Sequence, residues 1–213
     1  MADTRTQNME KRRERTLEQA RKVLADGGFD ALNLRDLAEI SGITVPTIYN
    51  LIGNKAEILK ALVMGTFAKF EESLDSRLPC PTEQLPLLMM NTLADMIGSD
   101  EDSYRATALA TERLEMESEE GSDYGYRRAP LRKFARKMLL DARAEGLLKG
   151  DIDSDLLVEQ VIGIHQIAFR DWAHRAISLD DLRKQSLRGF YIALSADAVP
   201  EFRTQLVAQL KKL

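Results

Sequence analysis

The stretch of sequence that decides the fold is LRDLAEISGITVPTIYNLIGN, residues 34–54. Its apolar residues recur every three or four positions on both sides of Gly42, which is the spacing of amphipathic helices. A glycine at this place ends a helix without steric cost, because the residue that follows a helix usually adopts positive φ. Two short helices joined by such a turn are typical of a helix-turn-helix.

The second helix of this pair carries its own start signals. Thr44 can cap it through its hydroxyl, and Pro46 falls in the first turn, where a missing N–H costs little. Ile48, Leu51 and Ile52 follow the i, i+3, i+4 spacing of a buried face. The residues left to project outward, toward a DNA major groove, are Thr44, Val45, Thr47, Tyr49 and Asn50. The stretch predicts DNA recognition, although glycine-turn helix pairs also occur in enzymes and in plain helical hairpins.

The composition favours helices along the whole chain. Of 213 residues, 44% are apolar and 30% are charged, with only 6 Pro and 12 Gly, and no run of alternating β-branched residues is present. We therefore expect an all-α fold. The polar first residues lack the apolar core of a signal peptide, and no apolar stretch approaches the roughly 20 residues that cross a bilayer. These features predict a soluble, cytoplasmic protein with no membrane partner.

The chain is poor in the side chains that carry metal and covalent chemistry. Cys80 is the single cysteine, so a disulfide within one chain and a thiolate zinc cluster are excluded. We expect it to be an incidental loop thiol, with a redox sensor as the alternative. His165 and His174 lie nine positions apart, which is not the i, i+4 spacing of a helical metal pair. With no nucleophile–base pair and no phosphate-binding loop either, we expect no metal, no cofactor and no enzymatic activity.

The net charge of −4 is unevenly distributed. Residues 1–60 contain ten Lys and Arg against nine acidic residues, whereas the rest of the chain has an acidic excess. Four of the cations cluster near the start of the chain and can meet DNA phosphates: Lys11, Arg12, Arg13 and Arg15. A solvated helix face explains the same cluster equally well.

Helix signals divide the remaining chain. A first helix is expected from Glu10 to Asp26, and a long helix is expected to run from Asn54 toward Arg77. The loop LPCPTEQLP follows it. Further helices are expected near residues 83–97, 101–117, 129–146, 153–175, 179–195 and 199–212. The predicted domains are an N-terminal helix-turn-helix domain, residues 1–54, and a larger helical domain, residues 55–213.

The segment 153–175 is apolar on more than one side, so it should be buried on more than one side. One apolar stripe can close the chain's own core while another contacts a second copy of the chain. A central helix of a monomeric bundle is the alternative. The residues of this helix and the next that we assign to a dimer interface are Leu157, Val161, Ile164, Trp172, Leu187, Tyr191 and Leu194.

The order of these segments resembles the tetracycline-repressor (TetR) family of bacterial one-component regulators. The resemblance is most specific from Leu17 to Leu62, which includes ARKVLADGGFDALNLRDLAEISGITVPTIYNLIGNKAEILKAL. Family members show there a Gly-Phe or Gly-Tyr step, a helix-turn-helix with an aromatic-rich recognition helix, and a lysine and glutamate that start the fourth helix. The resemblance implies a three-helix DNA-binding domain, with effector binding and dimerisation assigned to residues 55–213.

Carried over position by position, the resemblance implies a set of DNA contacts. The front of the recognition helix approaches the bases, Tyr49 and Asn50 contact phosphate or base edges, and Arg35 and Lys55 each hold a phosphate. The full set is Arg35, Thr44, Val45, Pro46, Thr47, Tyr49, Asn50 and Lys55. The chain departs from the family at Leu51–Ile52, where a His-Phe pair is usual, so a contact often made by that histidine is absent. Position 50 varies within the family, so no base preference transfers.

The resemblance further implies a regulator, expected to be a repressor, that binds a palindromic double-stranded operator as a homodimer and is released by a small molecule. The residues available for a pocket suggest an apolar or aromatic effector. The candidate ligand-binding residues are Met89, Met116, Met138, His165 and Phe169. Ordinary core packing also explains these methionines, and His165 is either a pocket or a core residue. The alternatives in function are a DNA-binding silencer without an effector and a helical scaffold without a ligand.

Overall fold

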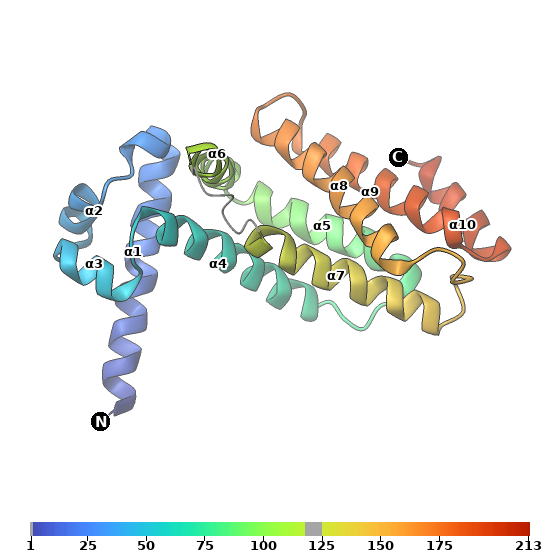
Figure 1. Ribbon diagram of the computed structural model, residues 1–213, viewed down its shortest axis with the longest axis horizontal. Helices are drawn as coiled ribbons and strands as arrows, with labels where there is room; N and C mark the ends of the chain where they lie inside the picture. Colours follow the sequence, from blue (N-terminus) through green and yellow to red (C-terminus); the bar gives the residue numbers. More distant parts are fainter. Residues whose placement is uncertain (1, 118–124) are drawn as a thin grey trace. The chain divides into compact units, whose positions relative to one another are not determined.

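The computed structural model describes residues 2–117 and 125–213, and every named element in these ranges is a helix (Figure 1). The predicted all-α fold is therefore confirmed. In chain order the elements are α1 (Ala2–Ala31), α2 (Leu34–Ser41), α3 (Val45–Leu51), α4 (Lys55–Asp75), the 3-10 turn η1 (Thr82–Gln84), α5 (Leu85–Gly98), α6 (Glu101–Glu117), α7 (Gly125–Ala144), α8 (Ser154–Ala173), α9 (Leu179–Asp197) and α10 (Pro200–Leu210).

The helices form two compact units that do not follow a single cut in the sequence. The first unit holds the chain up to Ala68 together with α6, and the second holds Lys69–Ser99 together with α7 to α10. The change from one unit to the other therefore falls inside α4, and α6 returns to the first unit. The functional boundary expected at residue 54 is a separate question and stays a prediction.

The core of the first unit is built from α1, α2, α3, α4 and α6. The buried side chains that meet there include Leu24 of α1, Leu37 of α2, Ile48 of α3, Leu59 of α4 and Ala110 of α6. The helix α1 starts earlier than the expected Glu10. Most of the described side chains in its first turns are exposed, so no apolar pattern marks this part of the helix in the sequence. Four elements besides α1 thus share one apolar centre, and each is held by tertiary contacts rather than by helix propensity alone.

The second unit has α8 and α9 as its central hairpin (Figure 1). Its core combines Phe70 and Leu74 from the end of α4 with apolar side chains of α5, α7, α8, α9 and α10. One polar pair is buried in the hairpin, where Nδ1 of His165 on α8 lies 2.9 Å from Oγ of Ser186 on α9. Burial lowers the pKa of His165 to about 4, because an imidazolium in this place loses its hydration.

A second buried polar group fastens the loop between α7 and α8. The carboxylate of Asp197, at the end of α9, is 2% exposed and accepts hydrogen bonds from the backbone amides of Gly150, Asp151 and Ile152 at 2.9, 2.9 and 3.2 Å. The amide of Lys149 donates to the carbonyl oxygen of Asp197 at 2.8 Å. One residue therefore satisfies four backbone donors in a loop that lies 45 to 48 positions earlier in the chain, and it joins the start of α8 to the end of α9.

We expect Asp197→Ala to lower the free energy of unfolding by about 2–4 kcal/mol, because a buried backbone donor without an acceptor costs about 1–3 kcal/mol. Denaturant unfolding followed by circular dichroism measures the effect. The exposed Asp151→Ala is the matched control, since it keeps the backbone amide that Asp197 binds. Equal midpoints for Asp197→Ala and the control would contradict the anchoring role.

The burial of His165 predicts a dependence of stability on pH. Its folded pKa of about 4 lies below the ordinary value of 6.5, so the unfolded state binds a proton first as the pH falls. The stabilising contribution is complete above pH 6.5 and is lost as the pH falls from 6.5 toward 4. We expect wild type to lose about 2 kcal/mol more stability between pH 7 and 5 than His165→Gln.

Thermal unfolding at a series of pH values tests this expectation. The exposed His174→Gln is the control and should follow wild type across the same range. Parallel curves for wild type and His165→Gln would show that the burial of this imidazole does not govern the acid sensitivity.

Candidate nucleic-acid interface

The turn between α2 and α3 is fixed by local hydrogen bonds. The side chain of Asn33 accepts a bond from the backbone amide of Asp36 at 2.9 Å, which caps the start of α2. At the other end Gly42 adopts the left-handed conformation, with φ of 66°, and the amide of Ile43 donates to the Ala38 carbonyl at 3.0 Å. The predicted helix–glycine turn–helix is present, and its turn angle is set by the glycine.

The short helix α3 is capped at its start and anchored by one buried side chain. The hydroxyl oxygen of Thr44 accepts a bond from the Thr47 amide at 3.4 Å, and Pro46 occupies the first turn, where no intrahelical donor is needed. Ile48 is fully buried in the core of the first unit. This single buried side chain decides which side of the helix faces solvent.

The exposed side of α3 carries the polar residues predicted from the sequence. Thr44, Pro46, Tyr49 and Asn50 are exposed, with Tyr49 at 54%. The remaining two predicted contact residues of this helix, Val45 and Thr47, are half-buried. Hydroxyl and amide groups of this kind exchange hydrogen bonds with base edges. The helix VPTIYNL has no charged side chain, so any attraction to phosphates must come from neighbouring elements.

The two predicted phosphate-binding residues have different surroundings. Arg35 is exposed in the first turn of α2. Lys55 is half-buried at the first position of α4, and its ammonium donates a hydrogen bond to the carbonyl oxygen of Phe29 at 2.6 Å. The same nitrogen lies 3.5 Å from the centre of the Phe29 ring. Sequence reasoning did not anticipate this contact, because the two residues are 26 positions apart.

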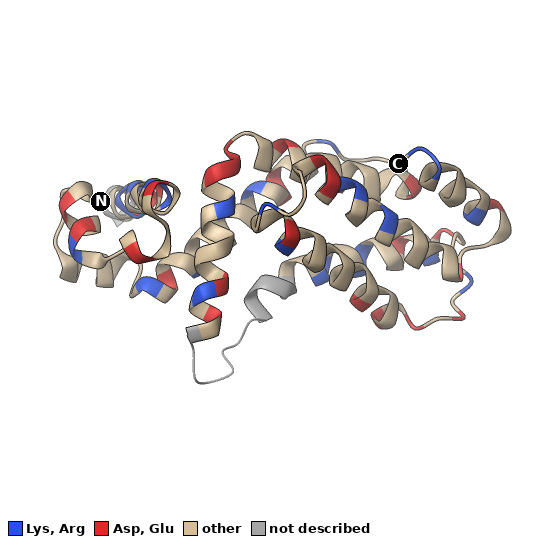
Figure 2. Ribbon diagram, turned by 90° about the horizontal axis from the view of Figure 1, so that it is seen from above, with Lys and Arg blue, Asp and Glu red and all other residues tan. Residues whose placement is uncertain are grey.

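Basic and acidic residues are interspersed along the described helices (Figure 2). Near the start of α1, Lys11, Arg12 and Arg15 are exposed, whereas Arg13 is half-buried and lies 3.4 Å from Glu10. Exposed cations of this kind give sequence-independent attraction to a phosphate backbone. These positions are the part of α1 that can add to the charge of Arg35 and Lys55.

The predicted ligand-binding residues differ in burial and do not all lie in the same unit. Met89 and Met138 are buried in the core of the second unit, so the core explanation of these methionines fits their surroundings. Met116 lies on α6, in the other unit, where it is 74% exposed. His165 is buried, and the half-buried Phe169 has its ring centre 6.0 Å from that of His165.

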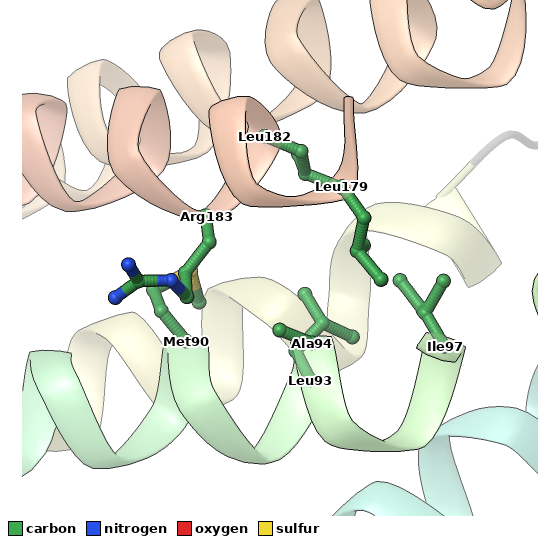
Figure 3. Close-up of a pocket in the computed structure, with 7 residues that line it drawn as sticks. All are labelled: Met90, Leu93, Ala94, Ile97, Leu179, Leu182 and Arg183. Carbon is green, nitrogen blue, oxygen red and sulfur yellow. The ribbon is translucent and has the colours of Figure 1, made fainter. Parts of the chain in front are cut away.

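The second unit also has a shallow recess between α5 and the start of α9 (Figure 3). Its volume is about 180 Å³ including space open to solvent, and its walls close too tightly to admit a water molecule. The three- and four-residue spacing along α5 was the available sequence signal, but the opposing wall comes from a distant segment. The lining residues are Met90, Leu93, Ala94, Ile97, Leu179, Leu182 and Arg183.

The residues assigned to a dimer interface face the core of a single chain. All but one of them are buried there, and Trp172 and Leu187 have no exposed surface. A second chain could contact these six only if the core opened, so an interface on α8 and α9 has to be built from other side chains. The buried residues are Leu157, Val161, Trp172, Leu187, Tyr191 and Leu194, while Ile164 is half-buried. The large apolar residues exposed on these two helices are Leu156, Ile167 and Ile192.

Among the described residues, no three His, Cys, Asp or Glu side chains are grouped so that they could hold a metal ion. No helix in the described part of the chain is both long enough and apolar enough to span a bilayer.

Comparison with known proteins agrees with the geometry of the first unit. Residues 17–62 match the family model for bacterial regulatory proteins of the tetR family. This range contains the whole helix-turn-helix and the start of α4. No protein of curated function matches the chain in sequence.

Solved structures similar to this chain share its fold at low sequence identity. SmeT, the repressor of the Stenotrophomonas maltophilia multidrug efflux pump SmeDEF, is 18% identical, with a TM-score of 0.66 over 89% of this chain and 92% of SmeT. A regulator from Syntrophomonas wolfei described as TetR-family is 15% identical, with a TM-score of 0.69 over 93% of this chain and 96% of its own. The fatty acid degradation regulator FadR from Bacillus halodurans is 16% identical, with a TM-score of 0.66 over 85% of this chain and 97% of FadR.

The family match covers the helix-turn-helix, and the structural likeness covers most of the chain. Together with the exposed polar side of α3, they confirm the resemblance inferred from residues 17–62. Residues 17–62 form a DNA-binding segment of the tetR family of bacterial regulatory proteins, and the chain as a whole has the fold of TetR-family regulators.

Proposed function

We propose that this protein is a repressor that binds a palindromic DNA operator as a homodimer and is released from it by a small apolar or aromatic molecule. The observation that carries the proposal is the orientation of α3, with Ile48 fully buried and Tyr49 and Asn50 exposed on the other side. A repressor role also has a precedent in SmeT, which shares the fold.

Specificity and charge are divided between different elements in this proposal. The neutral side chains of α3 read base edges, with Thr47 and Asn50 as hydrogen-bonding groups and Val45 as an apolar contact for a thymine methyl. Arg35, Lys55 and the cations at the start of α1 contact phosphates and orient the helix. One short recognition helix gives limited affinity, which is why two copies on a palindrome are needed.

A homodimer in this proposal uses the outer faces of α8 and α9. Leu156 and Ile167 are 62% and 64% exposed and lie three helical turns apart on the same face of α8, while Ile192 of α9 is 60% exposed. Solvent-exposed apolar side chains at this level cost free energy in a monomer, and covering them with a symmetric partner removes that cost.

The proposed effector is a small apolar or aromatic molecule that binds in the second unit. The second unit supplies an apolar interior with one neutral polar pair, His165 and Ser186, which suits an apolar or aromatic molecule with a single hydrogen-bonding group. Such a molecule has to displace core side chains, because Met89 and Met138 fill their surroundings and the recess beside Arg183 does not admit water. The same tightness favours the alternative of a silencer without an effector.

Selection of bound sequences from random duplex DNA at near-physiological salt tests the function. Recovery of a palindrome supports specific recognition by a dimer and supplies a probe on which apolar and aromatic compounds can be screened for release. Release by one of them separates a regulated repressor from a silencer. Recovery of no sequence above background would overturn the proposal and leave a helical scaffold.

We expect Tyr49→Ala to weaken binding to the selected operator about tenfold or more, since one good base or phosphate contact is worth about 1–3 kcal/mol. The side chain is 54% exposed, so the melting temperature should stay within about 2 °C of wild type. Met64→Ala, at an exposed position of α4 in the same unit, is the control and should bind as wild type does. A large loss of melting temperature in Tyr49→Ala would identify a packing role instead.

A charged residue introduced into the proposed dimer surface should weaken the dimer. We expect Ile167→Glu and Ile192→Glu to raise the dimer dissociation constant at least about 100-fold, because an unpaired carboxylate would be desolvated in the interface. Sedimentation equilibrium measures the change. Leu140→Glu, on the 48%-exposed position of α7, should leave the dimer intact. Dissociation by Leu140→Glu alone would move the interface to α7.

A further inference from the structure

The residues between Gly28 and α2 do not continue the helical path of α1. The helix breaks at Gly28, with φ of 70° and ψ of −164°, and the residues after it lead to the capping residue Asn33. The carbonyl oxygen of Phe29 accepts a bond from the Leu32 amide at 3.2 Å and another from the ammonium of Lys55 at 2.6 Å. This turn therefore joins the entry to α2 with the first residue of α4.

Lys55 is held by both the main chain and the side chain of Phe29. Its ammonium nitrogen lies 3.5 Å from the centre of the Phe29 ring, well within the distance at which a cation is attracted to an aromatic face. A lysine side chain is long and loses rotamer freedom when it is fixed on a ligand. A lysine that is already fixed before binding loses less of it.

Arg113 of α6 contacts the same turn. Its guanidinium nitrogen lies 2.6 Å from a carboxylate oxygen of Asp30, and its central carbon lies 5.0 Å from the centre of the Phe29 ring. The buried Ala110, one turn earlier on α6, sits in the core of the first unit and fixes where Arg113 emerges. Lys55 of α4 and Arg113 of α6 thus both contact the turn that holds Phe29 and Asp30.

We propose that Arg113 is a positioning residue for DNA binding, which acts through the Phe29 turn to hold the ammonium of Lys55 ready for a DNA phosphate. The inference rests on the proposed function, because it assigns Lys55 a phosphate. An ammonium has three N–H donors, and the bond to the Phe29 carbonyl uses one of them. The Phe29 ring and carbonyl therefore orient the ammonium of Lys55.

Because the Arg113–Asp30 pair is exposed, its effect on the position of the turn can be measured apart from its effect on the stability of the fold. The two side chains are 45% and 74% exposed, and an ion pair at that exposure contributes little to the free energy of folding. Removing Arg113 should therefore leave the fold intact while the turn between α1 and α2 becomes less restrained. The consequence should be visible at Lys55, which α6 reaches through Phe29.

A measurement without DNA tests the geometry. In the nuclear magnetic resonance spectrum of wild type, we expect the ε-methylene of Lys55 to be shifted upfield by the ring current of Phe29. Phe29→Leu should abolish the shift and supplies the reference value. Arg113→Gln should lose at least half of it, and Arg113→Lys should recover part. An unchanged shift in Arg113→Gln, with Phe29→Leu showing the full loss, would overturn the proposal.

A double-mutant cycle with the selected operator tests the functional consequence. Lys55→Gln and Arg113→Gln should each weaken binding about fivefold, and each should lower the slope of log affinity against log salt by about 1. The double variant should be no weaker than Lys55→Gln within about twofold, because Arg113 acts through Lys55. Arg183→Gln, which breaks a surface ion pair of α9, should bind as wild type does.

The outcomes of the two experiments are distinguishable. Fully additive losses in the cycle would overturn the positioning role, since Arg113 would then act independently of Lys55. Failure of wild type to bind any duplex would overturn the proposed function and with it the role in DNA binding, whereas the ring-current shift would still report whether Arg113 holds Lys55. Loss of the helical circular dichroism signal in Arg113→Gln would also overturn the positioning role, because Arg113 would then be needed for folding.

Discussion

The exposed side of α3 depends on the burial of Ile48. A helix of seven residues is too short to persist on its own in water, so α3 exists because Ile48 enters an apolar centre that α1, α2, α4 and α6 also share. Gly42 ends α2 and Thr44 caps the start of α3, so the turn between the two helices is fixed as well. With these restraints only one rotation of the helix is available, and Tyr49 and Asn50 are the residues that this rotation exposes. A polar group in place of Ile48 would disturb all of them together.

The helix-turn-helix could be predicted because its determinants are local. The glycine turn at Gly42, the cap at Thr44 and the proline at position 46 act within four residues of one another, and the structure has all three where the spacing put them. The outward residues followed from the same period. The surroundings of Lys55 could not be predicted in this way, since they depend on Phe29 and on a separate helix, α6.

The second unit shows where periodicity alone is ambiguous. The apolar stripes of segment 153–175 correctly indicate burial on more than one side of α8, but they do not say which neighbour covers each side. The chain's own α7 and α9 cover most of it, so Leu157, Val161 and Trp172 are core residues and the exposed apolar positions are fewer and different. Isolated exposed residues such as Ile167 carry a weaker sequence signal than a stripe, because a single apolar residue among polar ones is common on any surface.

The return of α6 to the first unit has a consequence for synthesis. The apolar centre around Ile48 includes Ala110, yet the chain between Ala68 and Asp100 belongs to the other unit. During translation, therefore, the first unit stays incomplete until α6 has left the ribosome, with an intervening segment of the second unit already made. The early helices must wait with part of their apolar surface uncovered, and a contiguous N-terminal fragment ending in α4 would keep that surface open permanently.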